Sequence, residues 1–148
     1  KPMSDDMGAT GAKTPWHLWV VGVVSLLWNS FGCFDFTMTA TRNAAYLEPY
    51  PQEMLDYWFA MPMWAWALWV IGVFGGLLGS VLLLLRRKLA VPIFAASFLG
   101  AAISMLVGTL DQNAPRMEGA GVMSAFIVII AALFVAYAWW MSRRDVLR

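Results

Sequence analysis

MWAWALWVIGVFGGLLGSVLLLL, residues 63–85, is the stretch that decides the fold, because it carries no charge and is followed at once by Arg86, Arg87 and Lys88. A helix needs roughly 20 mostly apolar residues to cross a hydrocarbon core of about 30 Å, since each residue advances it by about 1.5 Å. Residues 63–85 meet that length. The sequence therefore predicts a membrane-spanning helix that ends at a basic turn.

Three further segments have the same length and character: 16–38, 89–110 and 119–141. No segment alternates as a barrel strand does, and a closed barrel needs more segments than this chain supplies. The predicted fold class is an all-α integral membrane protein, a bundle of four transmembrane helices over residues 16–141. A flexible tail is expected at 1–15 and a basic tail at 142–148.

The composition limits the function. Of 148 residues, 61% are hydrophobic and 13% are charged, and the net charge of +1 gives no basic surface for nucleic acid. A single Cys33 and a single His17 are too few for a disulfide framework, a usual metal site or a haem with two histidine ligands.

Catalytic patterns are missing from the sequence. There is no G-x-S-x-G, no H-E-x-x-H and no phosphate-binding glycine loop, and the interiors of the second, third and fourth spans carry no Asp, Glu, Lys, Arg or His. We therefore predict a protein that is not an enzyme and that holds no metal and no cofactor.

Basic residues predict the orientation, because cytoplasmic loops are enriched in Lys and Arg. The residues of one side are Arg86, Arg87, Lys88, Arg143, Arg144 and Arg148. The opposite loops are acidic on balance, with Glu48, Glu53 and Asp56 in one and Asp111 and Glu118 in the other. Both termini are predicted to face the cytoplasm, with the 41–62 loop outside.

The 41–62 loop contains a predicted short helix. Pro51 suits the start of a helix, and Met54, Leu55, Trp58 and Phe59 then recur at helical spacing. This amphipathic helix either lies on the outer membrane surface or caps the bundle.

Small residues mark the expected contacts between spans, because helices in lipid associate by close packing and hydrogen bonds. On the second and third spans, the four-residue spacing selects Gly72, Gly76, Ser80, Gly100, Ser104 and Gly108. The fourth span repeats the pattern at Gly121 and Ala125, then at Ala132 and Ala136. These faces serve either the bundle itself or contacts with other membrane subunits or a second copy.

LWNSFGCFDFTMT, residues 27–39, carries the polar side chains of the first span. At about 100° per residue, one face carries a polar stripe that we expect to point into the bundle. Its members are Ser25, Trp28, Gly32, Asp35 and Thr39, with Asn29 at the edge and Arg42 beyond.

The stripe has three interpretations. In the first, Asp35 is interfacial and pairs with Arg42 or Arg116, and Asn29 bonds to another helix. In the second, Asn29, Asp35 and Thr39 form a small polar pocket, open to the outside, for a hydroxylated or cationic solute. In the third, Asp35 is a proton-coupling carboxylate.

Two stretches carry a family resemblance: TPWHLWVVGVVSLLWNSFGCFDFTMTATRNAAYL and MPMWAWALWVIGVFGGLLGSVLLLLRRKLAVPIFAASFLG. They resemble a family of small four-span bacterial inner-membrane proteins whose members often carry the label "sugar transporter". The resemblance implies a multi-pass protein of the bacterial inner membrane.

Two functions follow as hypotheses. The first is a non-enzymatic protein that acts through helix–helix contacts, as an accessory or scaffold subunit of a larger membrane complex or as a homo-oligomer. The alternative is an oligomeric transporter of a small, sugar-like solute that uses the polar stripe on the first span.

Overall fold

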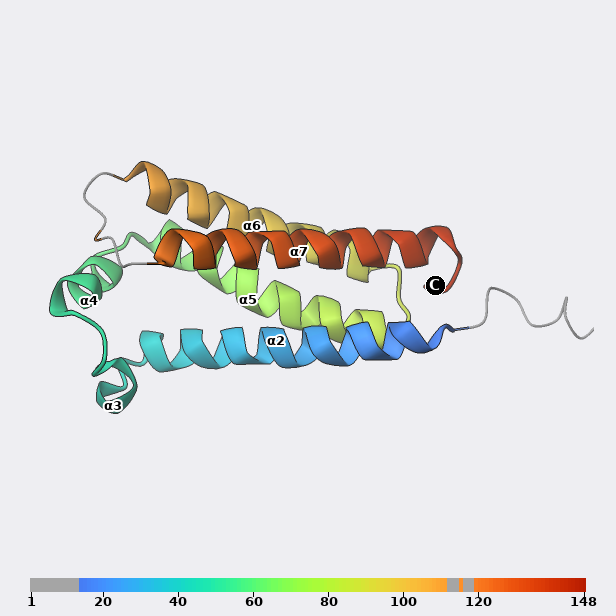
Figure 1. Cartoon of the computed structure of the whole chain (residues 1–148), viewed down its shortest axis with the longest axis horizontal. Helices are drawn as coiled ribbons and strands as arrows, with labels where there is room; N and C mark the ends of the chain where they lie inside the picture. The colour runs from blue at the N-terminus through green and yellow to red at the C-terminus, as the bar shows by residue number, and fades with distance from the viewer. Residues whose placement is uncertain (1–13, 112–114, 116–118) are drawn as a thin grey trace, which may run out of the picture.

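The structure is a computed structural model that describes residues 14–111, 115 and 119–148. Its helices are α2 (Trp16–Ala40), α3 (Ala44–Leu47), α4 (Gln52–Phe59), α5 (Met63–Leu84), α6 (Ala90–Leu110) and α7 (Ala120–Arg143). The four long helices run side by side along the molecule, as Figure 1 shows, and each is long and apolar enough to cross a membrane. The predicted fold class is confirmed. Most of the tail predicted at 1–15 lies outside the described residues.

Proline and glycine define where the helices begin. Pro15, Pro51 and Pro62 immediately precede α2, α4 and α5, each in an extended conformation. Proline suits this place because its fixed φ leads into the first turn and it has no N–H that would lack a partner. Gly119 precedes α7 with φ of 81°, in the left-handed region that favours glycine.

The four spans do not close into a ring. Close backbone packing joins α2 to α5, α5 to α6 and α6 to α7. α5 therefore has two packed neighbours, whereas α7 packs closely on α6 and meets α2 through side-chain rings.

The contact between α5 and α6 is built on small residues. A Cβ on Gly100 would lie 3.0 Å from the carbonyl oxygen of Leu68 and 3.2 Å from the backbone nitrogen of Gly72. Ser97 adds a hydrogen bond, since its Oγ donates to the carbonyl oxygen of Gly72 at 2.6 Å. The two backbones thus approach closely and are also tied by a polar bond, which is how helices associate in lipid.

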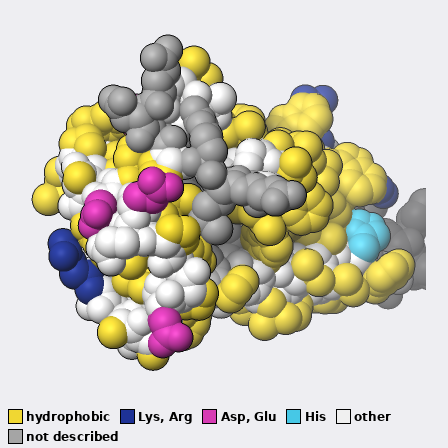
Figure 2. Space-filling view, turned by 60° about the vertical axis from the view of Figure 1, so that its left-hand side comes forward, with side chains coloured by type: hydrophobic (Ala, Val, Ile, Leu, Met, Phe, Trp, Pro, Cys, Tyr) yellow, Lys and Arg dark blue, Asp and Glu magenta, His cyan; other side chains and the backbone are white. Residues whose placement is uncertain are grey.

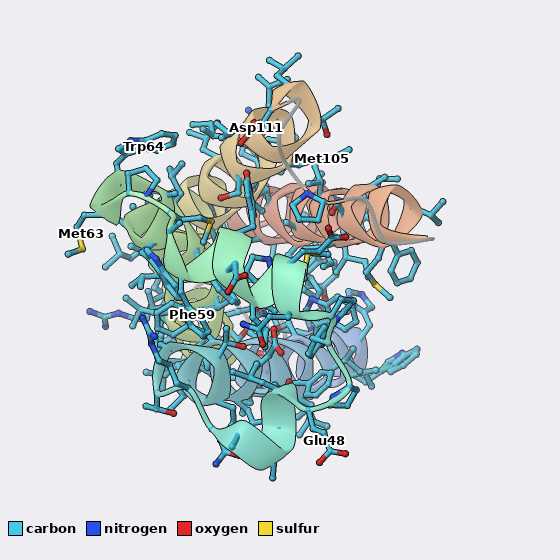
Figure 3. The ribbon with its side chains drawn as sticks, turned by 90° about the vertical axis from the view of Figure 1, so that its left-hand side faces the viewer. Glu48, Phe59, Met63, Trp64, Met105 and Asp111 are labelled. Carbon is cyan, nitrogen blue, oxygen red and sulfur yellow. The ribbon has the colours of Figure 1, made fainter. Side chains whose placement is uncertain are left out.

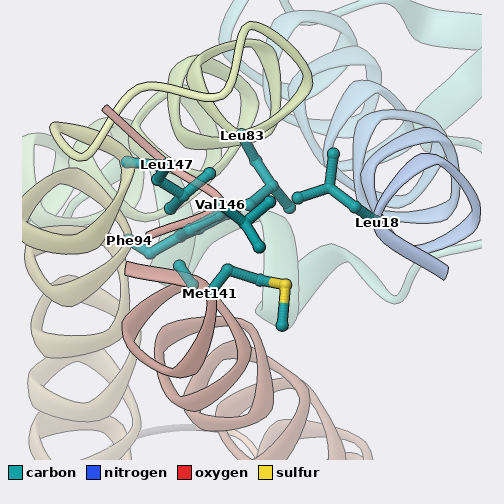
Figure 4. Packing of buried hydrophobic residues seen from close by; sticks show 8 residues of the cluster. Leu18, Leu83, Phe94, Met141, Val146 and Leu147 are labelled. Atoms are coloured by element: carbon teal, nitrogen blue, oxygen red, sulfur yellow. The ribbon is translucent and has the colours of Figure 1, made fainter. Parts of the chain in front are cut away.

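One end of the bundle carries Arg86, Arg87, Lys88, Arg143, Arg144 and Arg148, and we call it the basic end. Its core gathers side chains from all four spans, as Figure 4 shows from close by. The cluster consists of Leu18, Leu83, Ala90, Phe94, Ala138, Met141, Val146 and Leu147.

The segment after α7 folds back into this core. Val146 and Leu147 are 3% and 2% exposed. The segment also pairs with the loop between α5 and α6: Lys88 N–H donates to the Arg148 carbonyl oxygen at 2.6 Å, and Arg148 N–H donates to the Arg86 carbonyl oxygen at 2.7 Å. Residues 142–148, expected as a simple basic tail, thus include a buried apolar pair that fills the space between the spans.

The opposite end of the bundle, which faces the viewer in Figure 3, is covered by α4. Met54 is 7% exposed, and the Tyr57 hydroxyl donates to Asp111 Oδ2 at the end of α6 at 2.8 Å. Phe59 stacks on Trp66 of α5 with ring centroids 6.4 Å apart. Of the two interpretations of the predicted amphipathic helix, these contacts favour a cap over the bundle. Figure 2 shows acidic side chains on this end and hydrophobic ones along the body.

The predicted orientation can be tested with two cysteine variants in a Cys33→Ala background. Glu48 and Arg87 are both exposed and lie at opposite ends of the bundle. We expect a membrane-impermeant thiol reagent to label Glu48→Cys on intact cells, and Arg87→Cys only after the cells are permeabilised, because basic loops face the cytoplasm. The reverse labelling pattern would contradict the orientation.

Leu147→Ala should reveal how much the folded-back segment contributes to the stability of the fold. The substitution leaves a cavity among packed side chains, so we expect the free energy of unfolding in detergent micelles to fall by about 2–3 kcal/mol. Leu85→Ala is the matched control, since Leu85 is 63% exposed, and it should change stability by less than about 0.5 kcal/mol. Equal losses for the two variants would show that Leu147 does not stabilise the fold.

Candidate functional site

Three buried polar side chains join α2 to α5: Ser25 and Asn29 near the middle of α2, and Ser80 about one turn before the end of α5. Ser25 Oγ lies 2.8 Å from Ser80 Oγ, and Asn29 Nδ2 donates to the same oxygen at 3.3 Å. Asn29 Nδ2 also donates to the carbonyl oxygen of Ser25 at 2.8 Å, and Ser80 Oγ lies 2.8 Å from the carbonyl oxygen of Gly76. We call Ser25, Asn29 and Ser80 the serine–asparagine cluster.

The cluster fits because Gly76 has no side chain. A Cβ at Gly76 would lie 2.0 Å from Asn29 Oδ1, so the asparagine occupies the space that any larger residue would need. In the part of the chain that the structure describes, no fully buried side-chain nitrogen or oxygen lacks a hydrogen-bond partner. The hydroxyl and amide donors of the cluster therefore all bond within the chain, as buried polar groups in lipid require.

Asp35 does not join this cluster. Its carboxylate accepts a hydrogen bond from the hydroxyl of Tyr46 on α3, and the Tyr46 ring packs edge-on against Phe34 at 5.7 Å. The bond to Asp35, together with burial, raises the pKa of the Tyr46 phenol above its ordinary value. Asn29 thus bonds to Ser25 and to Ser80 of α5, whereas Asp35 bonds to α3.

Other members of the predicted stripe have separate surroundings. The Arg42 guanidinium lies over the ring of Phe59, 4.1 Å from its centroid, and Arg116, the other suggested partner of Asp35, lies outside the described residues. Trp28 packs edge-on against Phe126 of α7 at 6.2 Å. A Cβ on Gly32 would approach Val73 at 3.3 Å, so this glycine marks a close contact with α5. Thr39 is 2% exposed.

The predicted helix-contact residues divide into two groups. Gly72, Gly76, Ser80 and Gly100 lie where neighbouring spans meet. Ser104 is half-buried, and a Cβ on Gly108 would meet no atom within 4 Å among the residues that the structure describes. The spans thus approach closely through the first half of α6 and separate towards its end.

Two aromatic groups were not anticipated from the sequence. Phe36 of α2 meets Trp66, Trp69 and Phe74 of α5 edge-on, with centroids 5.0–5.8 Å apart. Trp66 and Trp69 are about one helical turn apart in the sequence, and this spacing predicts that both rings lie on the same face of the helix.

The second group lies at the basic end. His17 Nδ1 and the Tyr137 hydroxyl are hydrogen-bonded at 2.5 Å, and the His17 ring stacks on Trp140 at 5.8 Å. His17 is thus one of the few residues that link α2 to α7. Its pairing with Tyr137 is a long-range contact that sequence spacing does not indicate.

Within residues 14–111, 115 and 119–148, no three His, Cys, Asp or Glu side chains form a group suited to a metal ion. Cys33 is buried, and its Sγ lies 3.3 Å from the carbonyl oxygen of Val73, where it serves the contact between α2 and α5.

Comparison with models of known protein families, with curated proteins and with solved structures finds no match to this chain. Its function is therefore argued from its own residues.

Gly76→Ala should separate α2 from α5. The added methyl group overlaps Asn29, so we expect the free energy of unfolding to fall by about 1–3 kcal/mol, the usual range for overpacking. Gly121→Ala is the matched control, because a Cβ there would meet no atom within 4 Å, and its stability should be unchanged or slightly higher. The assignment of Gly76 to the contact fails if both variants unfold at the same temperature in detergent.

Proposed function

We propose that the chain is a non-enzymatic protein of the bacterial inner membrane that acts through helix–helix contacts, as an accessory subunit of a larger complex or as a homo-oligomer. The observation that carries the proposal is the open order of the spans, in which α7 has one closely packed neighbour. In the most apolar 18-residue stretch of α7, 6% of the positions are buried, against 22% in each of the other spans.

The surface of α7 supports a contact with another helix. Gly121, Ala125 and Ala132 fall on one flank of the helix at about 100° per residue. Small residues let two backbones approach closely, which is the main source of helix association in lipid. A Cβ on Gly121 would meet no atom of the described residues within 4 Å, so none of these residues packs against this end of the flank.

The polar groups of the bundle agree with this role. The serine–asparagine cluster is satisfied within the chain, and Asp35 is bonded to Tyr46. These side chains hold the helices together and leave little chemistry for a reaction, which supports a protein without catalytic activity. The basic end, with its Arg and Lys residues, is proposed to face the cytoplasm.

The alternative is an oligomeric transporter of a small, sugar-like solute. It is supported by the family resemblance and by the polar residues of α2. Ser25, Asn29 and Ser80 already bond to one another within the chain, so this alternative needs a solute site built from other polar groups or between protomers. The first proposal requires no such additional site.

Gly121→Leu tests the proposal. The larger side chain should prevent close approach to the flank of α7 and weaken association about tenfold, which corresponds to about 1.4 kcal/mol. The measurement is the mass of the particle after gentle solubilisation, with mass spectrometry of the proteins that co-purify. A stoichiometric second protein identifies an accessory subunit, and a particle of two or more copies identifies a homo-oligomer.

Met123→Phe is the matched control. Met123 is two residues away at a similar depth, is 57% exposed and lies on the opposite flank of α7. This variant should associate as the unaltered protein does. A monomer without any partner before substitution, or equal losses in the two variants, would refute the proposal.

A further inference from the structure

A hollow of about 430 Å³ lies between α2 and α7, and we call it the α2–α7 groove. It is lined by Val21 of α2 and by Leu133, Phe134, Ala136, Tyr137 and Trp140 of α7. The ring contact of Trp28 with Phe126 lies beyond one end of the groove, and His17 with Tyr137 and Trp140 lies at the other. The two helices therefore touch at two levels and stand apart between them.

The lining determines what can fill the groove. Its one polar side-chain group besides the Trp140 indole is the Tyr137 hydroxyl, which is bonded to His17. A water molecule in a cavity needs two to four polar partners, so this surface does not suit water. An apolar cavity of about 150 Å³ already binds benzene. The groove has nearly three times that volume, and a flexible hydrocarbon chain from the surrounding bilayer suits its shape and chemistry.

Positive charge lies at the end of the groove. Arg144 sits over the ring of Trp140, with its guanidinium carbon 5.4 Å from the centroid, and Trp140 lines the groove. Arg144 is exposed, so its N–H groups are available outside the bundle. Guanidinium groups bind phosphate oxygens in a planar, two-point arrangement. An acyl chain in the groove would place its own head group beside this cation.

We propose that the α2–α7 groove binds one acyl chain of an anionic phospholipid, and that Arg144 binds the phosphate of its head group. The occupant follows from the combination of an apolar groove with a cation at its basic end, which is the pattern of lipid sites between transmembrane helices. The lipid supplies the contacts that α2 and α7 do not make with each other. The groove lining includes none of Gly121, Ala125 and Ala132, and the site requires no partner protein.

The test is native mass spectrometry of the full chain in a mild detergent with added phosphatidylglycerol or phosphatidylcholine of identical acyl chains. We expect one phosphatidylglycerol to be retained and phosphatidylcholine to be retained at least about fivefold less, because an anionic head group gains from the nearby arginine. Arg144→Gln should reduce phosphatidylglycerol retention by about fivefold.

Two further variants make the result specific. Arg143→Gln is the matched control, because Arg143 lies over Trp139, which is not part of the groove lining, and it should retain phosphatidylglycerol as the unaltered protein does. Ala136→Phe fills the groove and should reduce retention of both lipids. Thermal unfolding of each variant checks that the fold is intact.

Three outcomes would overturn the proposal. Both head groups carry a phosphate, and the choline cation offsets its charge in phosphatidylcholine. Equal retention of the two lipids would therefore show that the anionic charge of the head group is not recognised. Equal losses for Arg143→Gln and Arg144→Gln would show general attraction to a basic surface. If Ala136→Phe abolished a dimer and left lipid retention unchanged, a second copy of this chain would be the occupant of the groove.

Discussion

The hydrogen bonds that meet at Ser80 Oγ hold α2 against α5, and the arrangement of the bundle depends on this contact. Hydrocarbon chains are as apolar as leucine, so burial of apolar surface gives the spans no reason to pair. A polar group that would otherwise lack a partner in lipid does give such a reason. Ser25 and Asn29 reach the same oxygen from α2, and Gly76 provides the space that Asn29 occupies.

α5 acts as the centre of the bundle because two of its faces are built for close approach. On one face, Gly76 lies against Asn29 of α2, and on another, Gly72 lies against Ser97 and Gly100 of α6. The α5 sequence can serve both neighbours because Gly75 and Gly76 are adjacent and face different helices. A Cβ on Gly75 would meet Ser97 of α6 at 3.3 Å, and a Cβ on Gly76 would overlap Asn29 of α2. α7 has no comparable contact with α2, and this difference leaves the groove between them.

Much of the fold follows from the sequence for simple reasons. An uncharged, apolar stretch as long as residues 63–85 is typical of a spanning helix. The small residues Gly72, Gly76 and Gly100 lie at contacts between helices. The expected bond from Asn29 to another helix is also present. These features depend on local composition and helical periodicity, which are visible in one sequence.

The remaining features depend on contacts between distant residues. Asp35 lies beside Tyr46 because the chain turns back after α2 into the short helix α3, and a four-residue helix leaves no periodic signal. Val146 and Leu147 are only two apolar residues in a basic stretch, so their burial depends on the space that the four spans leave. The pairing of His17 with Tyr137 likewise requires the relative position of α2 and α7.

The order of the spans has a consequence for how the protein is made. Every close contact between long helices joins two spans that follow each other in the chain, so each newly inserted helix finds its neighbour already in the bilayer. Contacts of this kind cost little loop entropy and form quickly. Val146 and Leu147 leave the ribosome after all four spans, and the cluster that they complete includes Leu18 from the first of them. Synthesis and packing can therefore proceed in the same direction, with the core at the basic end finished last.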